Sequence, residues 1–130
     1  MKTSSVFQGK ETYRKGEENM GLSYGLKLTW DDFWDGQENN PNNELTFLYK
    51  GNCYILLHTE YKWIIAEYTG DSAEIGKPLA SASENNPGHK NYHDQANWDD
   101  MISKCYAVLT APIFDGKSFR DVIEDIIFEN

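Results

Sequence analysis

Residues 44–59 read ELTFLYKGNCYILLHT, and this stretch decides the fold. Polar and apolar side chains alternate over Glu44–Lys50, a period typical of a half-buried strand. The dipeptide Gly51-Asn52 then suits a tight two-residue hairpin turn. The strand that returns, Cys53–His58, is apolar on both faces. We therefore expect it to lie in the middle of an antiparallel sheet.

A turn at residues 51–52 also predicts which residues of the two strands face each other. Tyr49 would lie opposite Tyr54, and Leu45 would lie opposite His58. Both predictions follow from the length of the turn, because the turn sets the register of a hairpin.

Working outward, alternation predicts further strands over 22–30 and 63–69, besides those at 44–50 and 53–59. Apolar stripes at helical spacing predict helices over 98–107 and 118–128. A Ser118 cap with Asp121 at the third position opens the second helix, and a Thr29 cap opens one or two helical turns after the first strand. The predicted fold is α+β: an antiparallel sheet of three to four strands with helices on one face. Residues 22–130 would form one domain, preceded by a polar N-terminal arm over 1–21.

Composition narrows the class of protein. The chain has 130 residues, of which 39% are hydrophobic and 14% aromatic, and its formal net charge is −9. The aromatic content is too high for a disordered chain, and no apolar run is long enough to span a membrane. The negative charge argues against direct binding to nucleic acid, which requires a basic face. Without a secretory signal at the start, a cytoplasmic location with free Cys53 and Cys105 is expected.

The negative charge is concentrated in two segments. Residues 31–44 hold five acidic and no basic side chains, and residues 94–130 hold eight acidic and three basic ones. Such segments attract basic surfaces and repel nucleic acid. The alternative interpretation is that they only keep the protein soluble.

Both acidic segments place carboxylates beside aromatic rings, a combination that recognises guanidinium groups through ion pairs and stacking. The alternative is an acidic first turn that favours the helix dipole, with tryptophan in the core. The candidate partner-binding residues are Trp30, Asp31, Asp32, Trp34, Asp35, Glu38, Asp99, Asp100, Asp121, Glu124 and Asp125.

Catalytic and metal sites are weakly indicated. His89 and His93 are four residues apart, as in helical metal sites, and His58 and Cys105 are candidates for the further ligands. Their surroundings have the composition of a loop, however, and both cysteines are interpreted as small core residues. We therefore expect no catalytic residues, metal or cofactor.

Three short features, taken together, resemble a known class of proteins. They are the tight turn in Tyr49–Tyr54, a Trp-Asp-Asp helix start, and the closing segment Ile113–Phe119. The chain over 44–130 thus resembles small acidic proteins of phages and mobile elements of Gram-positive bacteria, some of which are anti-CRISPR proteins. The resemblance implies an inhibitor that occupies the nucleic-acid channel of an RNA-guided nuclease, where carboxylates would replace phosphates.

The leading hypothesis is therefore a non-enzymatic protein that binds and inhibits a partner with a basic nucleic-acid-binding surface. A second hypothesis is an immunity protein or antitoxin that neutralises a cationic toxin. A third is a small metal-dependent enzyme that uses His89 and His93. The oligomeric state stays open.

Overall fold

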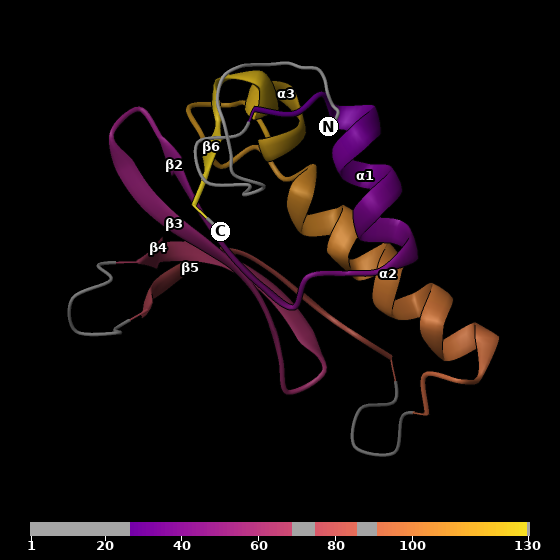
Figure 1. Cartoon of the computed structure of the whole chain (residues 1–130). Helices are drawn as coiled ribbons and strands as arrows, with labels where there is room; N and C mark the ends of the chain where they lie inside the picture. The colour runs from indigo at the N-terminus through magenta and orange to yellow at the C-terminus, as the bar shows by residue number, and fades with distance from the viewer. Residues whose placement is uncertain (1–26, 69–74, 86–90, 130) are drawn as a thin grey trace.

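A computed structural model of the chain describes residues 27–68, 75–85 and 91–129 (Figure 1). The N-terminal arm predicted over 1–21 lies outside these residues. The elements in chain order are α1 (Trp30–Asn39), β2 (Glu44–Tyr49), β3 (Asn52–Thr59), β4 (Lys62–Tyr68), β5 (Ile75–Ser83), α2 (Gln95–Leu109), α3 (Phe119–Val122), the 3₁₀ turn η2 (Ile123–Asp125) and β6 (Ile127–Phe128). None of the described helices is long and apolar enough to cross a membrane.

The sheet is antiparallel throughout and has the strand order β5-β4-β3-β2-β6. The predicted α+β class is confirmed, and β3 is the central strand, as its apolar faces indicated. Strands β2, β3 and β4 form a meander, while β6 returns from the C-terminal end of the chain to pair with the edge of β2.

The hairpin between β2 and β3 has a different register from the predicted one. Phe47 faces Tyr54 and Leu45 faces Leu56, so the turn is at Lys50 and Gly51 rather than at residues 51–52. Both turn residues have positive φ, 51° at Lys50 and 81° at Gly51, as a type I′ turn requires. The register error is two residues, so each side chain keeps its expected face of the sheet.

The helices pack on one face of the sheet, where α1 and α2 lie beside each other (Figure 1). The core between these layers includes fully buried Trp63, Phe47 and Phe119. Gln37 of α1 is buried as well. Its side-chain amide donates to the carbonyl of Asn42 and accepts from its N–H, which holds the loop between α1 and β2 against the helix.

The predicted strand 22–30 is wrong at its C-terminal end. Residues 27–29 have no strand structure, and α1 already begins at Trp30; residues 22–26 lie outside the described part. The hydroxyl of Thr29 accepts the N–H of Asp32, so the predicted cap is present. This cap favours a helix over a strand here, because the Thr29 hydroxyl satisfies the N–H of Asp32. In an extended chain that N–H would be left to solvent.

The predicted helix 98–107 is longer than its pattern suggested. It begins at Gln95 with Asp94 as the N-cap, whose carboxylate accepts from the N–H groups of Ala96 and Asn97. Asp99 therefore lies beyond the first turn, and its presence there is not explained by the helix dipole.

The predicted helix 118–128 is wrong beyond its first turn. The capping box of Ser118 and Asp121 is present, but α3 ends at Val122 and η2 ends at Asp125. Ile126 and Phe128 are buried while the residue between them is exposed, which is a strand period. Pairing with β2 satisfies backbone groups at the edge of the sheet, which continuing the helix would leave unpaired.

Strand β5 was not predicted at all. Its sequence, IGKPLASAS, combines glycine, proline and small residues, which are poor strand signals. It pairs only with β4 among the described strands, and Ala80 and Ala82 contact the core. Proline and exposed side chains are tolerated here because β5 is an edge strand.

Candidate functional site

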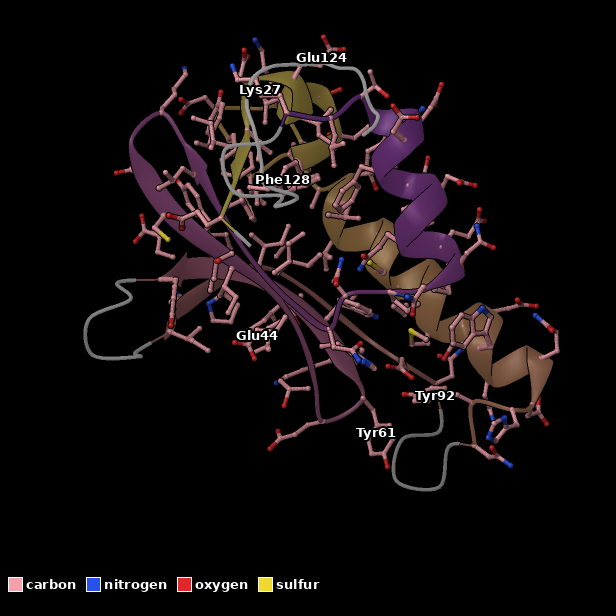
Figure 2. The ribbon with its side chains drawn as sticks, in the orientation of Figure 1. Lys27, Glu44, Tyr61, Tyr92, Glu124 and Phe128 are labelled. Atoms are coloured by element: carbon pink, nitrogen blue, oxygen red, sulfur yellow. The ribbon has the colours of Figure 1, made fainter. Side chains whose placement is uncertain are left out.

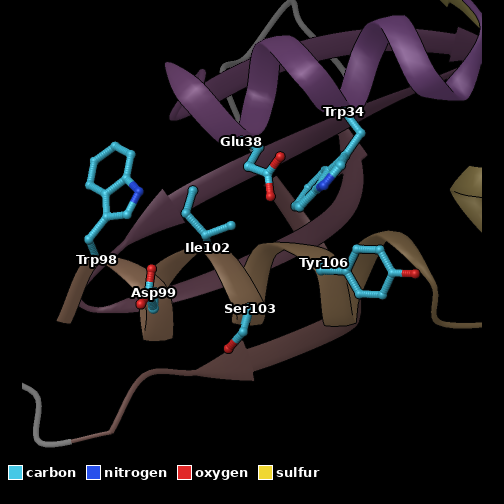
Figure 3. Close-up of a pocket in the computed structure, with 7 residues that line it drawn as sticks. All are labelled: Trp34, Glu38, Trp98, Asp99, Ile102, Ser103 and Tyr106. Carbon is cyan, nitrogen blue, oxygen red and sulfur yellow. The ribbon is translucent and has the colours of Figure 1, made fainter. Parts of the chain in front are cut away.

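An open groove of about 400 Å³ lies between α1 and α2 (Figure 3). The residues that line it are Trp34, Glu38, Trp98, Asp99, Ile102, Ser103 and Tyr106. Three aromatic rings and two carboxylates thus line the same groove. They come from segments about sixty residues apart in the chain, and each segment is one of the two acidic segments of the sequence.

Helical spacing explains how each wall of the groove is built. Trp34 and Glu38 are four residues apart, so they lie on the same side of α1. On α2, Trp98, Ile102 and Tyr106 form one row of the same spacing. Figure 3 shows Trp34 and Tyr106 at one end of the groove, Trp98 at the other, and Glu38 over Ile102 between them.

The aromatic end of the groove is extended by further rings. Trp30 stacks on Trp34 with ring centroids 5.5 Å apart, and Trp34 contacts Tyr106 edge-on at 5.3 Å. The guanidinium of Arg120 lies 5.2 Å from the centre of the Trp30 ring and donates to the hydroxyl of Tyr106 at 2.7 Å. The chain thus already holds one guanidinium group against this set of rings.

The carboxylates of Glu38 and Asp99 make few hydrogen bonds with other described residues of the protein. Glu38 is exposed, and within the described part of the chain it makes no hydrogen bond or ion pair. Asp99 is exposed and accepts one hydrogen bond, from the side-chain amide of Gln95 at 2.8 Å. A carboxylate accepts several hydrogen bonds, so both groups retain capacity for a cationic donor.

Five other candidate acids are exposed on two elements, α1 and η2. Asp31, Asp32 and Asp35 are exposed on α1, and the last accepts from the side chain of Asn39. Glu124 and Asp125 are exposed on η2, near the end of the molecule that carries α3 and away from the start of α2, where Figure 2 labels Tyr92.

Asp100 and Asp121 have roles within the fold. Asp100 accepts from the ammonium of Lys104 and from the backbone and side chain of Asn85. Asp121 accepts from the backbone N–H of Ser118 and its own N–H donates to the Ser118 hydroxyl. Donation to the Asp121 carboxylate from the backbone N–H of Ser118, and next from its hydroxyl, holds the pKa of this carboxyl group below its ordinary value.

Sequence reasoning missed part of the groove. Trp98, Ile102 and Tyr106 belong to the apolar stripe that predicts the helix over 98–107, a pattern typical of residues packed in the core, and Ser103 lies outside that stripe. The structure buries Ile102 but leaves Tyr106 37% exposed and Trp98 half-buried. The row of large side chains next to Asp99 indicates a candidate binding surface. The sequence does not show, however, which side chains of that row are covered by another helix and which stay exposed.

A second hollow, of about 230 Å³, lies beside the first and shares Trp98 with it. His58 and Tyr92 line it and meet the buried carboxylate of Glu84. The His58 Nε2 lies 2.5 Å from one carboxylate oxygen, and the Tyr92 hydroxyl donates to the other at 2.7 Å. Both ring nitrogens of His58 have a partner, since Nδ1 contacts the side chain of Asn43.

The histidines do not form a metal centre within the described residues, where no group of three or more potential ligands occurs. His93 is exposed, and His89 lies outside the described part. Burial raises the pKa of the Cys105 thiol to about 12 and that of Cys53 to about 11, the latter with help from the adjacent Glu129. Thiols with such values are poor nucleophiles near neutral pH.

Comparison of the chain with protein-family models, with curated proteins and with solved structures finds no match.

Proposed function

We propose that this protein is a non-enzymatic binding protein that recognises a basic, nucleic-acid-binding surface of another protein and thereby inhibits it. The observation that carries the proposal is the groove between α1 and α2, where both acidic segments contribute carboxylates beside aromatic rings. Protein interfaces favour such a combination of aromatic anchors and charged rim.

The partner is proposed to be an RNA-guided nuclease, as the resemblance to anti-CRISPR proteins suggests. Such nucleases hold nucleic acid in channels lined by lysine and arginine. A protein of net charge −9 is attracted to that channel over long range, and its carboxylates then compete with phosphates for the same side chains.

The test is capture of purified RNA-guided nucleases on the immobilised protein, with and without guide RNA, at low and high salt. We expect one nuclease to be captured at low salt, to be released by salt, and to be displaced by its target DNA. Capture that target DNA leaves unchanged would contradict competition for the channel.

A purified cationic toxin enzyme belongs in the same panel. An immunity protein presents the same surface chemistry, so capture of the toxin and of no nuclease would replace the nuclease proposal. Failure to capture any basic protein of the panel would overturn the proposed function.

A further inference from the structure

The groove is the continuation of a surface that already binds a guanidinium group. Arg120 lies over Trp30, and Trp30 stacks on Trp34, whose ring lines the groove. Guanidinium groups favour aromatic faces because the plane of the cation stacks on the negative face of the ring. The intramolecular contact between the exposed Arg120 and Trp30 shows that one ring on this side of α1 already holds a guanidinium group.

The groove itself has the three parts that an arginine side chain requires. Trp34 and Trp98 line the groove with half-buried indole rings, and Ile102, which is largely buried, adds a small apolar contact for the methylene stem. Glu38 and Asp99 come from different helices and place carboxylates on both sides of Ile102 (Figure 3). Two carboxylates disfavour an anionic occupant such as phosphate, and they favour a cation.

We propose that this groove binds an arginine side chain of the partner protein, with the guanidinium stacked on an indole ring and donating to Glu38 and Asp99. The proposal rests on the proposed function and names the group that the surface recognises. Arginine fits better than lysine because its planar donor fork stacks and hydrogen-bonds at once, whereas an ammonium is a strongly hydrated point charge.

The experiment is a titration of the isotope-labelled protein, followed by heteronuclear NMR at the indole N–H signals. The probe is the peptide acetyl-Gly-Arg-Gly-amide, and the control is the same peptide with neutral citrulline in place of arginine. We expect the signals of Trp34 and Trp98 to shift with the arginine peptide. The signal of Trp63 is the internal reference, since its indole N–H is buried and donates to the carbonyl of Met101.

A matched pair of double variants tests the carboxylates. Glu38→Gln with Asp99→Asn should weaken binding of the arginine peptide about tenfold, the loss expected when charge-assisted hydrogen bonds become neutral ones. Glu44→Gln with Asp115→Asn removes the same charge from exposed positions outside α1 and α2 and should change the affinity less than about twofold. All four side chains are exposed, so both variants should keep the dispersed spectrum of the folded protein.

The results separate this proposal from the proposed function. Equal shifts with arginine and citrulline, or equal weakening in both variants, would overturn arginine binding in the groove. If the arginine peptide does not bind but a nuclease is still captured, the groove proposal fails and the proposed function stands. If the arginine peptide binds specifically but no basic protein is captured, arginine binding in the groove is supported and the proposed inhibitory function is overturned.

Discussion

At the scale of single residues, Glu84 shows how much of the fold depends on one polar side chain. Its carboxylate is fully buried directly after β5 and accepts hydrogen bonds from His58 of β3 and from Tyr92, which precedes α2. Burial and the contact with Glu84 raise the pKa of the Tyr92 hydroxyl, so it remains a donor at all ordinary pH values. One carboxylate thereby joins three parts of the chain, beneath the second hollow.

Replacing Glu84 tests this role. Glu84→Ala should lower the free energy of unfolding by about 3 kcal/mol, because it leaves the buried ends of His58 and Tyr92 without their partner. Urea unfolding measures the change. Glu84→Gln retains an acceptor for Tyr92 and should lose distinctly less, so equal stability of the two variants would contradict the role assigned to the hydrogen bonds.

At the scale of elements, short local signals decide where helices begin and how strands turn. Thr29 and Ser118 each accept a backbone N–H in the first turn of the helix that follows. The type I′ turn at Lys50 and Gly51 sets the hairpin register, because a turn of this type twists in the same sense as the strands that it joins. The sequence favoured residues 51–52 instead, since lysine is an unusual residue at positive φ.

Gly51 and Gly36 form a matched pair for testing the turn. A methyl group added at either position meets no atom of the residues packed around it within 4 Å. The two variants therefore differ in the backbone conformation at the substituted residue and not in steric contacts. Gly51→Ala should lower the free energy of unfolding by about 1 kcal/mol or more, because φ is +81° there. Gly36→Ala, within α1, should raise it by up to about 1 kcal/mol. Denaturant unfolding of both variants checks the opposite signs, and equal effects would contradict the assigned turn.

The capping box of α3 gives a prediction for pH. The folded protein holds the pKa of Asp121 below 3.8, so the stabilisation is complete above that value and is lost as the pH falls through the folded pKa. Asp121→Asn should therefore be less stable than the wild type near neutral pH. We expect the difference in unfolding midpoint to shrink as the pH falls below 3.8.

Ser118→Ala serves as the control for this pH effect. It removes the hydroxyl contact but leaves the backbone N–H of residue 118, which is the larger cause of the lowered pKa. In this background the pH-dependent difference caused by Asp121→Asn should be smaller but not absent. A difference that is the same at pH values far above and far below 3.8 would show that Asp121 does not stabilise α3 through its charge.

At the scale of the whole molecule, the groove exists because the sheet and helices bring two distant segments together. The periodicity of the sequence indicates that Trp34 and Glu38 share one side of a helix, and that Trp98 and Ile102 share a side of another. It does not indicate that these sides face each other across a groove. That depends on how α1 and α2 pack on the sheet, which involves core residues throughout the chain.

Charge reversal tests the long-range part of the proposed function. Asp31→Lys with Asp32→Lys and Asp35→Lys should slow association with a captured nuclease by about tenfold or more at low salt, while dissociation changes little. The three side chains are exposed, so circular dichroism should remain that of the folded protein. The loss should diminish at high salt, where charges are screened. An unchanged association rate would mean that these acids are only a solvated helix start.

Local patterns in the sequence by themselves determined the α+β class, the central β2–β4 meander and the helix caps at Thr29 and Ser118. They could do so because alternation, helical stripes and capping depend on residues a few positions apart. Tertiary structure alone decided the edge strands β5 and β6, since these form where a neighbouring strand offers unpaired backbone groups. Tertiary structure also decided that Glu38 and Asp99 line the same groove. The two residues lie on different helices, so their proximity depends on how both helices pack on the core.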